Sequence, residues 1–117
     1  MKIIHNRYIP FKGFDAVNLF GVLFARKGFS ADPFILNHEK IHTAQMKELL
    51  YIGFYMVYVF EFFFRMLQCL FQDNSKHKGI SLWNRAYRLI SFEKESYGHE
   101  KDLEYLRKRK QYAMWRE

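Results

Sequence analysis

The chain has a single cysteine, Cys69, and this scarcity excludes a disulfide framework within the chain. Nothing in the cysteine content therefore argues for secretion. The N-terminus also lacks an apolar signal-peptide core, because residues 1–4 are followed at once by the polar residues 5–7. These absences predict a protein of the cytoplasm, or of its membrane surface, without a signal peptide.

Size and composition favour one small folded domain. With 117 residues, half of them apolar, the chain can build one compact core, so we expect a single domain over residues 1–117. The chain has 13 Phe, 8 Tyr and 2 Trp, and this aromatic content predicts a folded domain and not a disordered chain.

The net charge of +7 fits three situations: a nucleic-acid partner, an anionic membrane surface or a solvated face. Part of the surplus lies in the run Arg-Lys-Arg-Lys at residues 107–110. No RNA- or DNA-binding signature accompanies this run, so we expect no nucleic-acid partner. The basic tail 107–117 is instead a candidate for a segment that folds over a cleft.

The N-terminal part of the chain has the composition of β-structure. Residues 2–9 are rich in β-formers, and residues 16–27 are predicted to form a second strand that stops at Gly28. The two strands form a β-hairpin or a small sheet, although a helix over 15–25 is an alternative. Gly21, inside the second strand, indicates a bulge or a close approach of the backbone to another segment.

A helix-start signal follows at residues 30–33, where Ser-Ala-Asp-Pro combines short polar cap residues with a proline just inside the helix. The helix predicted from it covers residues 33–50. It is able to continue without a break into residues 51–71, apart from Gly53.

Residues 49–71 are the most apolar stretch and are long enough to cross a bilayer, which needs about 20 residues. Glu61 and Arg65 argue against a simple span, but at a spacing of four they can pair along a helix. Three tyrosines between residues 51 and 58 give one side an amphipathic rim. Three interpretations stay open: a buried core helix, a helix that faces a membrane surface or another copy of the chain, and a true span.

The remaining chain is predicted to be a polar loop over 73–79, a helix over 82–90 and, after a kink at Ser91, a helix over 92–113 with Gly98 as a weak point. The expected fold class is α+β and mainly helical. An N-terminal β-hairpin or small sheet packs on a helix that carries the motif described next, and a second helix carries a glutamate.

The strongest motif is His38-Glu39-Lys40-Ile41-His42. In a helix, residues four apart lie on one face, so both imidazoles can aim at one metal ion. Two neutral imidazoles at this spacing suit tetrahedral zinc. Glu39 sits beside the first ligand, where it can act as general base on a metal-bound water without binding the ion. The alternative is that His38 and His42 are ordinary half-buried polar residues.

A third ligand has to come from another segment, and the candidates cluster in residues 92–100. Glu93 and Glu95 point to nearly opposite sides of a helix, so only one of them can face the metal. At this point the chain resembles the gluzincin clan of zinc peptidases, in which a later helix supplies a glutamate in a Glu-x-x-small-Asp pattern. The resemblance favours Glu93 as ligand, with Ser96 as the small residue, and leaves Glu95 as the rival.

The same resemblance implies roles for residues around the ligands. Tyr97 stands where the clan often has an Asp that supports a ligand histidine, so Asn37, Glu100 or a backbone carbonyl is expected to take that part. Tyr97 and His99 are candidates for stabilising the oxyanion of a tetrahedral intermediate. Gln45, three residues after His42, faces either the cleft or solvent.

An edge strand for the substrate is also implied, along which an extended peptide is bound by β-augmentation. Residues 19–26 would take that part, and we expect the contacts from Leu19, Phe20, Gly21, Val22 and Leu23.

The resemblance therefore implies a zinc-dependent metallopeptidase that acts on a peptide or protein substrate through a water activated by Glu39. The alternative is a catalytically silent zinc-binding or membrane-surface interaction module of the same fold. In either case residues 49–71 are candidates for contact with a membrane surface or for self-association.

Overall fold

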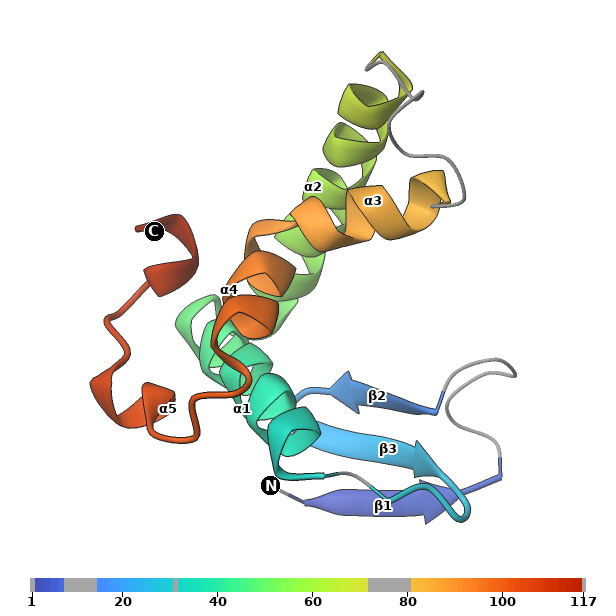
Figure 1. The fold of residues 1–117 in the computed structure, drawn as a ribbon, viewed down its shortest axis with the longest axis vertical. Coiled ribbons are helices and arrows are strands. Elements are labelled where there is room, and N and C mark those ends of the chain that lie inside the picture. Colours follow the sequence, from blue (N-terminus) through green and yellow to red (C-terminus); the bar gives the residue numbers. More distant parts are fainter. Residues whose placement is uncertain (1, 8–14, 31, 72–80, 117) are drawn as a thin grey trace.

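The structure is a computed structural model that describes residues 2–7, 15–30, 32–71 and 81–116. Its strands are β1 (Ile3–Asn6), β2 (Ala16–Leu19) and β3 (Val22–Arg26), which form one sheet in the order β1-β3-β2 (Figure 1). β1 is parallel to β3, and β2 is antiparallel to it. The mainly helical α+β fold and its small sheet are as predicted, but β3 is the central strand.

Residues 16–27 do not form the single strand that the sequence predicts, because a turn divides them into β2 and β3. Phe20 and Gly21 in this turn have φ angles of 53° and 88°. A Cβ atom on Gly21 would lie 3.3 Å from Cγ2 of Thr43, so the glycine permits the turn to approach the first helix closely.

The first helix, α1 (Pro33–Glu48), begins where the sequence predicts. The Asp32 side chain accepts a 2.8 Å hydrogen bond from the backbone N–H of Ile35, and Pro33 opens the first turn. Asn18 of β2 donates to the Glu39 carbonyl at 3.0 Å and thereby ties the sheet to this helix.

The chain reverses after α1, so the alternative of one continuous helix over 33–71 is wrong. Leu50 and Tyr51 adopt φ angles of 57° and 63°, and the Tyr51 N–H donates to the Met46 carbonyl at 2.7 Å. This left-handed ending resembles the caps that glycine usually makes, here without a glycine. Gly53 itself lies inside the next helix, α2 (Ile52–Leu70).

α2 exposes one side along its whole length, so it is not the buried core helix that was one interpretation of the sequence. It is long and apolar enough to cross a membrane by length and composition alone, and only 11% of its most apolar window is buried. Glu61 and Arg65 pair at 3.3 Å, as predicted. Six exposed side chains, which we call the outer stripe, recur at intervals of three or four residues: Ile52, Met56, Phe60, Phe63, Leu67 and Leu70.

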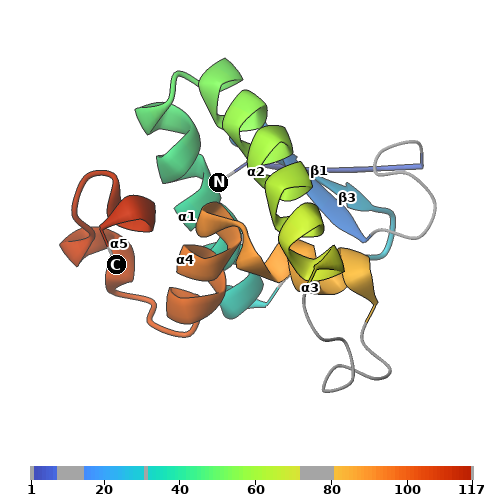
Figure 2. The ribbon, with the colours of Figure 1, turned by 90° about the horizontal axis from the view of Figure 1, so that it is seen from above.

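Two further helices, α3 (Leu82–Leu89) and α4 (Ser91–His99), meet at Ile90, whose ψ of 133° is extended and confirms the kink predicted next to it. α3 lies along α2, and α4 lies beside α1 (Figures 1 and 2). The predicted loop over 73–79 lies outside the described residues.

The helix predicted over 92–113 ends already at His99. Only α5 (Tyr105–Lys108) and the short 3-10 helix η2 (Ala113–Trp115) follow it in the described part of the tail. The Nδ2 atom of Asn37, on α1, lies within 3.2 Å of the carbonyls of residues 99, 100 and 102. These contacts satisfy the free carbonyls of the helix end and stop its continuation.

The hydrophobic core lies where α1, α2, α4 and the C-terminal segment converge. A cluster of five buried side chains from these segments and the α3–α4 junction fills it: Met46, Phe54, Ile90, Phe92 and Met114. α1 contributes Met46 to this core, so the core packs against the helix that carries the motif residues 38–42.

Candidate metal centre

α1 places two histidines on one buried face. His38 and His42 are four residues apart, so their side chains leave the helix on the same side. Their exposed fractions are 7% and 5%, and their Nε2 atoms lie 3.2 Å apart. Both rings turn Nε2 toward one point, so the two nitrogens are placed to bind the same atom or ion.

α4 brings Glu93 to the same point. Its Oε1 atom lies 3.3 Å from Nε2 of His38 and 3.2 Å from Nε2 of His42. Its Oε2 atom accepts a 2.8 Å hydrogen bond from the hydroxyl of Tyr58 on α2. Three helices therefore meet at one carboxylate, which is 3% exposed.

The three donor atoms form a nearly equilateral triangle with edges of 3.2, 3.2 and 3.3 Å. Zinc binds histidine nitrogen and carboxylate oxygen at about 2.0–2.1 Å, so two ligands of a tetrahedral ion are about 3.3 Å apart. Two histidines and one carboxylate also form a ligand set that leaves a fourth position open in catalytic zinc sites. The group His38, His42 and Glu93 thus fits a metal ion in donor type and in spacing.

Polar contacts on the far side of each ring orient the two histidines: a hydrogen bond for His42 and a longer charged contact for His38. His42 Nδ1 donates to Gln45 Oε1 at 2.8 Å, and His38 Nδ1 lies 3.5 Å from Glu100 Oε2. The Gln45 amide nitrogen in turn donates to the Phe92 carbonyl at 3.0 Å, which fixes which end of that amide faces His42. With Nδ1 of His42 hydrogen-bonded and Nδ1 of His38 turned toward Glu100, Nε2 of each ring is the atom that faces the common point.

The residues that the sequence offered as supports for a ligand histidine lie in different places. Glu100 lies beside His38, whereas Asn37 binds the end of α4. Gln45 is fully buried and contacts His42, so it faces neither solvent nor an open cleft.

Glu95, the rival third ligand, lies in a different network. Its carboxylate accepts hydrogen bonds from Tyr105 at 2.7 Å and from Arg109, and another from Gln45 at 3.0 Å. The side chain is fully buried in these contacts, and Glu93 is the glutamate of α4 that faces the two histidines. This agrees with the expectation that only one of the two glutamates faces the histidines.

The electrostatics of the group favour positive charge at its centre. Burial opposes charge on the His42 imidazole, but the adjacent Glu93 carboxylate outweighs burial and raises the pKa of His42 to about 9. Burial likewise opposes charge on Glu93, yet His42 and the hydrogen bonds it receives hold the pKa of Glu93 well below its usual range. Burial and the Glu93 charge raise the pKa of Tyr58, which therefore stays a neutral donor.

A cavity of about 300 Å³ adjoins the triangle. Glu39 lines it together with His42 and Glu93, so the glutamate of the motif borders the space next to the donor atoms without being one of them. Residues 16–19 of β2 form another part of the lining, and Tyr58 and Tyr87 contribute phenol groups. Sequence reasoning assigned no chemistry to these two tyrosines, because their helical spacing is also that of ordinary core or rim residues.

Tyr97 and His99 do not line this cavity, in contrast to their predicted role beside an oxyanion. The Tyr97 ring packs edge-on against His38 with centroids 4.6 Å apart. The His99 ring stacks on Tyr105 at 3.8 Å. Tyr97 thus packs on the His38 ring, where the gluzincin pattern has an Asp.

The predicted substrate edge, residues 19–23, is corrected by the sheet topology. Val22 and Leu23 belong to the central strand β3, whose two sides are already hydrogen-bonded, and Phe20 and Gly21 form the turn. Of the five predicted residues only Leu19 belongs to an edge strand, β2, and that strand lines the cavity.

Comparison with known proteins identifies no relative: no family model, no curated protein and no solved structure matches the chain. Function therefore has to be argued from the site itself.

Proposed function

We propose that the protein is a zinc-dependent metallopeptidase, with His38, His42 and Glu93 as the zinc ligands and Glu39 as general base. The observation that carries the proposal is the triangle of three buried donor atoms, with Glu39 on the cavity beside it. The resemblance to gluzincins implies the same assignment, with the two histidines and the base from residues 38–42 and the third ligand from residues 93–97.

The chemistry divides between the ion and the chain. When bound, zinc supplies a Lewis acid that lowers the pKa of water toward neutrality and polarises a substrate carbonyl. Glu39 accepts a proton from the attacking water in the cavity and passes it to the leaving amine. Gln45 and Glu100 keep the two imidazoles oriented, and Tyr58 holds the Glu93 carboxylate.

Tyr87 is the residue that we assign to the oxyanion. Its hydroxyl accepts a hydrogen bond from Tyr97 at 3.4 Å, which leaves its own proton for a group in the cavity. Burial and the nearby Glu93 charge raise the pKa of Tyr87, so the phenol stays protonated and able to donate. A neutral donor fixed before the reaction stabilises charge that develops on the substrate oxygen.

β2 is the element that we assign to the substrate. It is an edge strand beside the cavity, so an extended peptide can pair with its outer side. The Tyr55 hydroxyl donates to the Asn18 carbonyl at 3.3 Å, which closes one end of that edge and leaves the end near Ala16 for the peptide.

The decisive experiment combines metal analysis with hydrolysis of a library of unstructured peptides by Glu39→Gln. We expect one zinc per chain in both the original protein and this variant, and a loss of about 10²–10⁴ in kcat for the variant. Tyr87→Phe should also keep its zinc and lose about 10²–10³ in kcat. Glu93→Gln should lose zinc and activity together.

The matched control is Glu104→Gln, which removes a carboxylate that is 61% exposed and distant from the cavity lining. It should change neither zinc content nor kcat. Stoichiometric zinc without Glu39-dependent hydrolysis would instead identify a catalytically silent zinc-binding module. Protein that binds no zinc at any tested concentration would contradict both assignments.

A further inference from the structure

The outer stripe of α2 is a continuous apolar surface that the metal centre does not use. Its six side chains are between 55% and 76% exposed. At 100° per residue they fall within an arc of about 80°, and they extend about 27 Å along the helix axis. Figure 2 shows α2 with no other described element drawn over it. Soluble monomers rarely expose a patch of this extent unless it binds something.

The charged residues of α2 do not interrupt this surface. Glu61 and Arg65 lie on the opposite side of the helix, where the Glu61 carboxylate also accepts hydrogen bonds from the Ser91 N–H at 2.9 Å and the Ser91 hydroxyl at 2.8 Å. Glu61 therefore fixes α2 to the start of α4. This contact sets the rotation of α2 and keeps the outer stripe facing outward.

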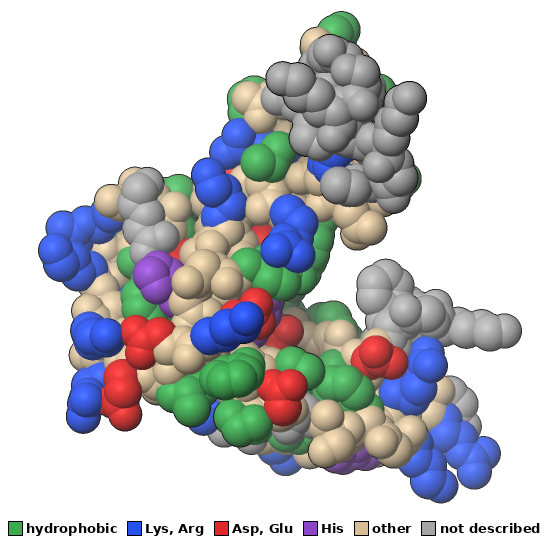
Figure 3. Space-filling view, viewed as in Figure 1, with side chains coloured by type: hydrophobic (Ala, Val, Ile, Leu, Met, Phe, Trp, Pro, Cys, Tyr) green, Lys and Arg blue, Asp and Glu red, His purple; other side chains and the backbone are tan. Residues whose placement is uncertain are grey.

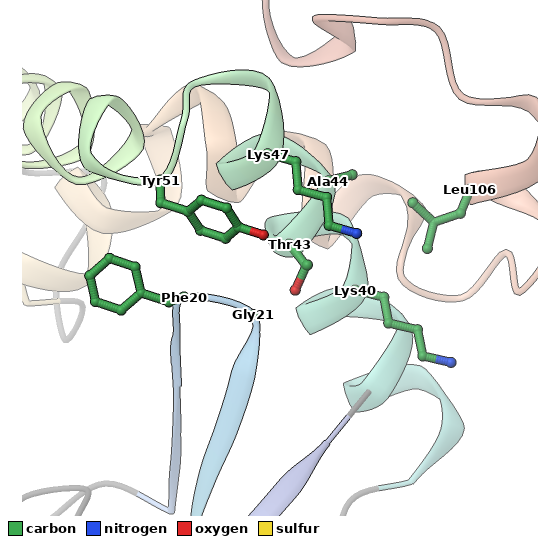
Figure 4. Close-up of a pocket in the computed structure, with 8 residues that line it drawn as sticks. All are labelled: Phe20, Gly21, Lys40, Thr43, Ala44, Lys47, Tyr51 and Leu106. Carbon is green, nitrogen blue, oxygen red and sulfur yellow. The ribbon is translucent and has the colours of Figure 1, made fainter.

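A basic pocket lies at the N-terminal end of α2. It has a volume of about 470 Å³ and lies between the β2–β3 turn, α1 and the turn before α2 (Figure 4). Lys40 and Lys47 are seven residues apart, so they leave α1 on the same side, and both are exposed. Phe20 and Tyr51 supply aromatic rings with centroids 6.1 Å apart. Lysines and tyrosines beside an apolar face are typical of protein segments at the headgroup level of a bilayer.

The charges near the outer stripe indicate which kind of partner binds it. Glu61 of α2 is paired with Arg65, and Glu48 at the end of α1 is paired with Arg109. Glu93 is buried on the inner side of α2, whereas Lys40 and Lys47 are exposed. Figure 3 shows Lys and Arg side chains also on the other side of the arm formed by α2 and α3, where α3 lies in front of α2. A second copy of the chain carries the same net charge of +7, which opposes pairing of two such faces, whereas anionic lipid attracts it.

The side of α2 opposite to the outer stripe makes polar contacts that argue against a helix spanning the membrane. Tyr55 donates to Asn18, Tyr58 to Glu93, and Glu61 accepts from Ser91. A helix that crossed the bilayer would have to give up these contacts, whereas a helix that lies in the interface keeps them.

We propose that the outer stripe docks on the surface of an anionic phospholipid bilayer, with Lys40, Lys47 and Tyr51 at the level of the lipid phosphates. The proposal does not depend on the metal centre, so protein treated with a chelator should bind in the same way. The cavity beside the triangle would then face substrates that are close to the membrane.

The test is flotation of the full chain with two kinds of vesicle, phosphatidylcholine alone and phosphatidylcholine mixed with phosphatidylglycerol. We expect the partition coefficient to be higher on the anionic vesicles and to fall as salt is added. Phe60→Ser together with Phe63→Ser should lower it by about a hundredfold or more, because two apolar side chains leave the lipid. Lys40→Gln together with Lys47→Gln should lower it by about 30-fold on anionic vesicles only.

Phe34→Ser together with Leu103→Ser is the matched control, because it replaces two apolar side chains that are 43% and 55% exposed outside α2. This pair should leave flotation unchanged. The proposal is overturned if the control lowers flotation as strongly, if both kinds of vesicle bind equally or if neither binds. Light scattering adds a further outcome: a dimer that forms without lipid and is lost in the Phe60, Phe63 variant would assign the stripe to a second copy of the chain.

Discussion

Two regions of the molecule differ in what they expose to solvent. One is the contact between α1 and α4, and the other is the outer stripe of α2. The first buries polar and charged groups, and the second exposes apolar ones, although burying charge and exposing apolar surface are both costly. The buried polar set is Asn37, His38, His42, Gln45, Glu93, Glu95 and Ser96. Stability alone would select neither arrangement, so each is a place where function has to be sought.

The difference also separates two kinds of stabilisation. The polar contact depends on complete pairing, because each buried group there has a named partner. The outer stripe contributes little to the fold, since more than half of each of its side chains is exposed to solvent. Variants on the two sides of α2, and variants inside and outside the polar contact, make this comparison measurable.

The largest effect is expected from Phe54→Ala compared with Phe63→Ala. Both residues belong to α2, but Phe54 is 3% exposed in the core and Phe63 is 60% exposed in the outer stripe. Removing the buried ring should lower the free energy of unfolding by about 3–5 kcal/mol, whereas the exposed ring should matter by about 0.5 kcal/mol at most. Urea denaturation measures both. Equal losses would mean that the outer stripe is packed and not free.

A somewhat smaller loss is expected from Arg109→Met compared with Arg107→Met. The Arg109 side chain is 6% exposed and pairs with Glu95 and Glu48, whereas Arg107 is 79% exposed and pairs with Glu104. Removal of Arg109 leaves two carboxylates in a mostly buried place and should cost about 3 kcal/mol. Removal of Arg107 should cost less than about 1 kcal/mol.

The pH dependence of this pair gives a second measurement. Burial opposes charge on Glu95, but its hydrogen bonds, first among them that from Arg109, lower the pKa of Glu95 below the ordinary value of 4.5. A lowered folded-state pKa stabilises the protein above pH 4.5, and this contribution is lost as the pH falls through the lowered value. The difference between Arg109→Met and the original protein should therefore shrink below pH 4.5. A constant difference down to acid unfolding would mean that Arg109 acts by packing alone.

Much of the candidate centre was predictable because it depends on local spacing. The four-residue step from His38 to His42 fixes their common face, and the helix-start signal at Asp32 and Pro33 places them in a helix. The choice of Glu93 over Glu95 required the resemblance, since periodicity only shows that the two face different sides. The partners that separate them in space, such as Arg109, come from a distant segment.

The incorrect predictions share one physical cause: the conformation at each place depends on contacts between residues far apart in the sequence. Leu50 and Tyr51 adopt left-handed angles for which the sequence has no glycine signal, so the sequence leaves open a continuous helix through residues 50 and 51. The turn at Phe20 and Gly21 was taken for a point inside one strand, and this error moved the substrate edge from β2 to β3. Hydrophobicity along residues 49–71 likewise predicted an apolar helix but could not tell which of its sides is covered.

The smallest effect is expected at Asn37, a polar residue of the α1–α4 contact that binds only carbonyls. Asn37→Ala removes the donor to the carbonyls of Glu100 and Asp102, just after α4, and should lower the free energy of unfolding by about 1–2 kcal/mol. Because this helix end carries Glu100, 3.5 Å from His38 Nδ1, zinc affinity should also fall about tenfold. Asn84→Ala, on the exposed side of α3, is the control and should change neither quantity. Loss of stability without any change in zinc affinity would separate the end of α4 from the metal centre and restrict the functional part of the contact to the ligands and Gln45.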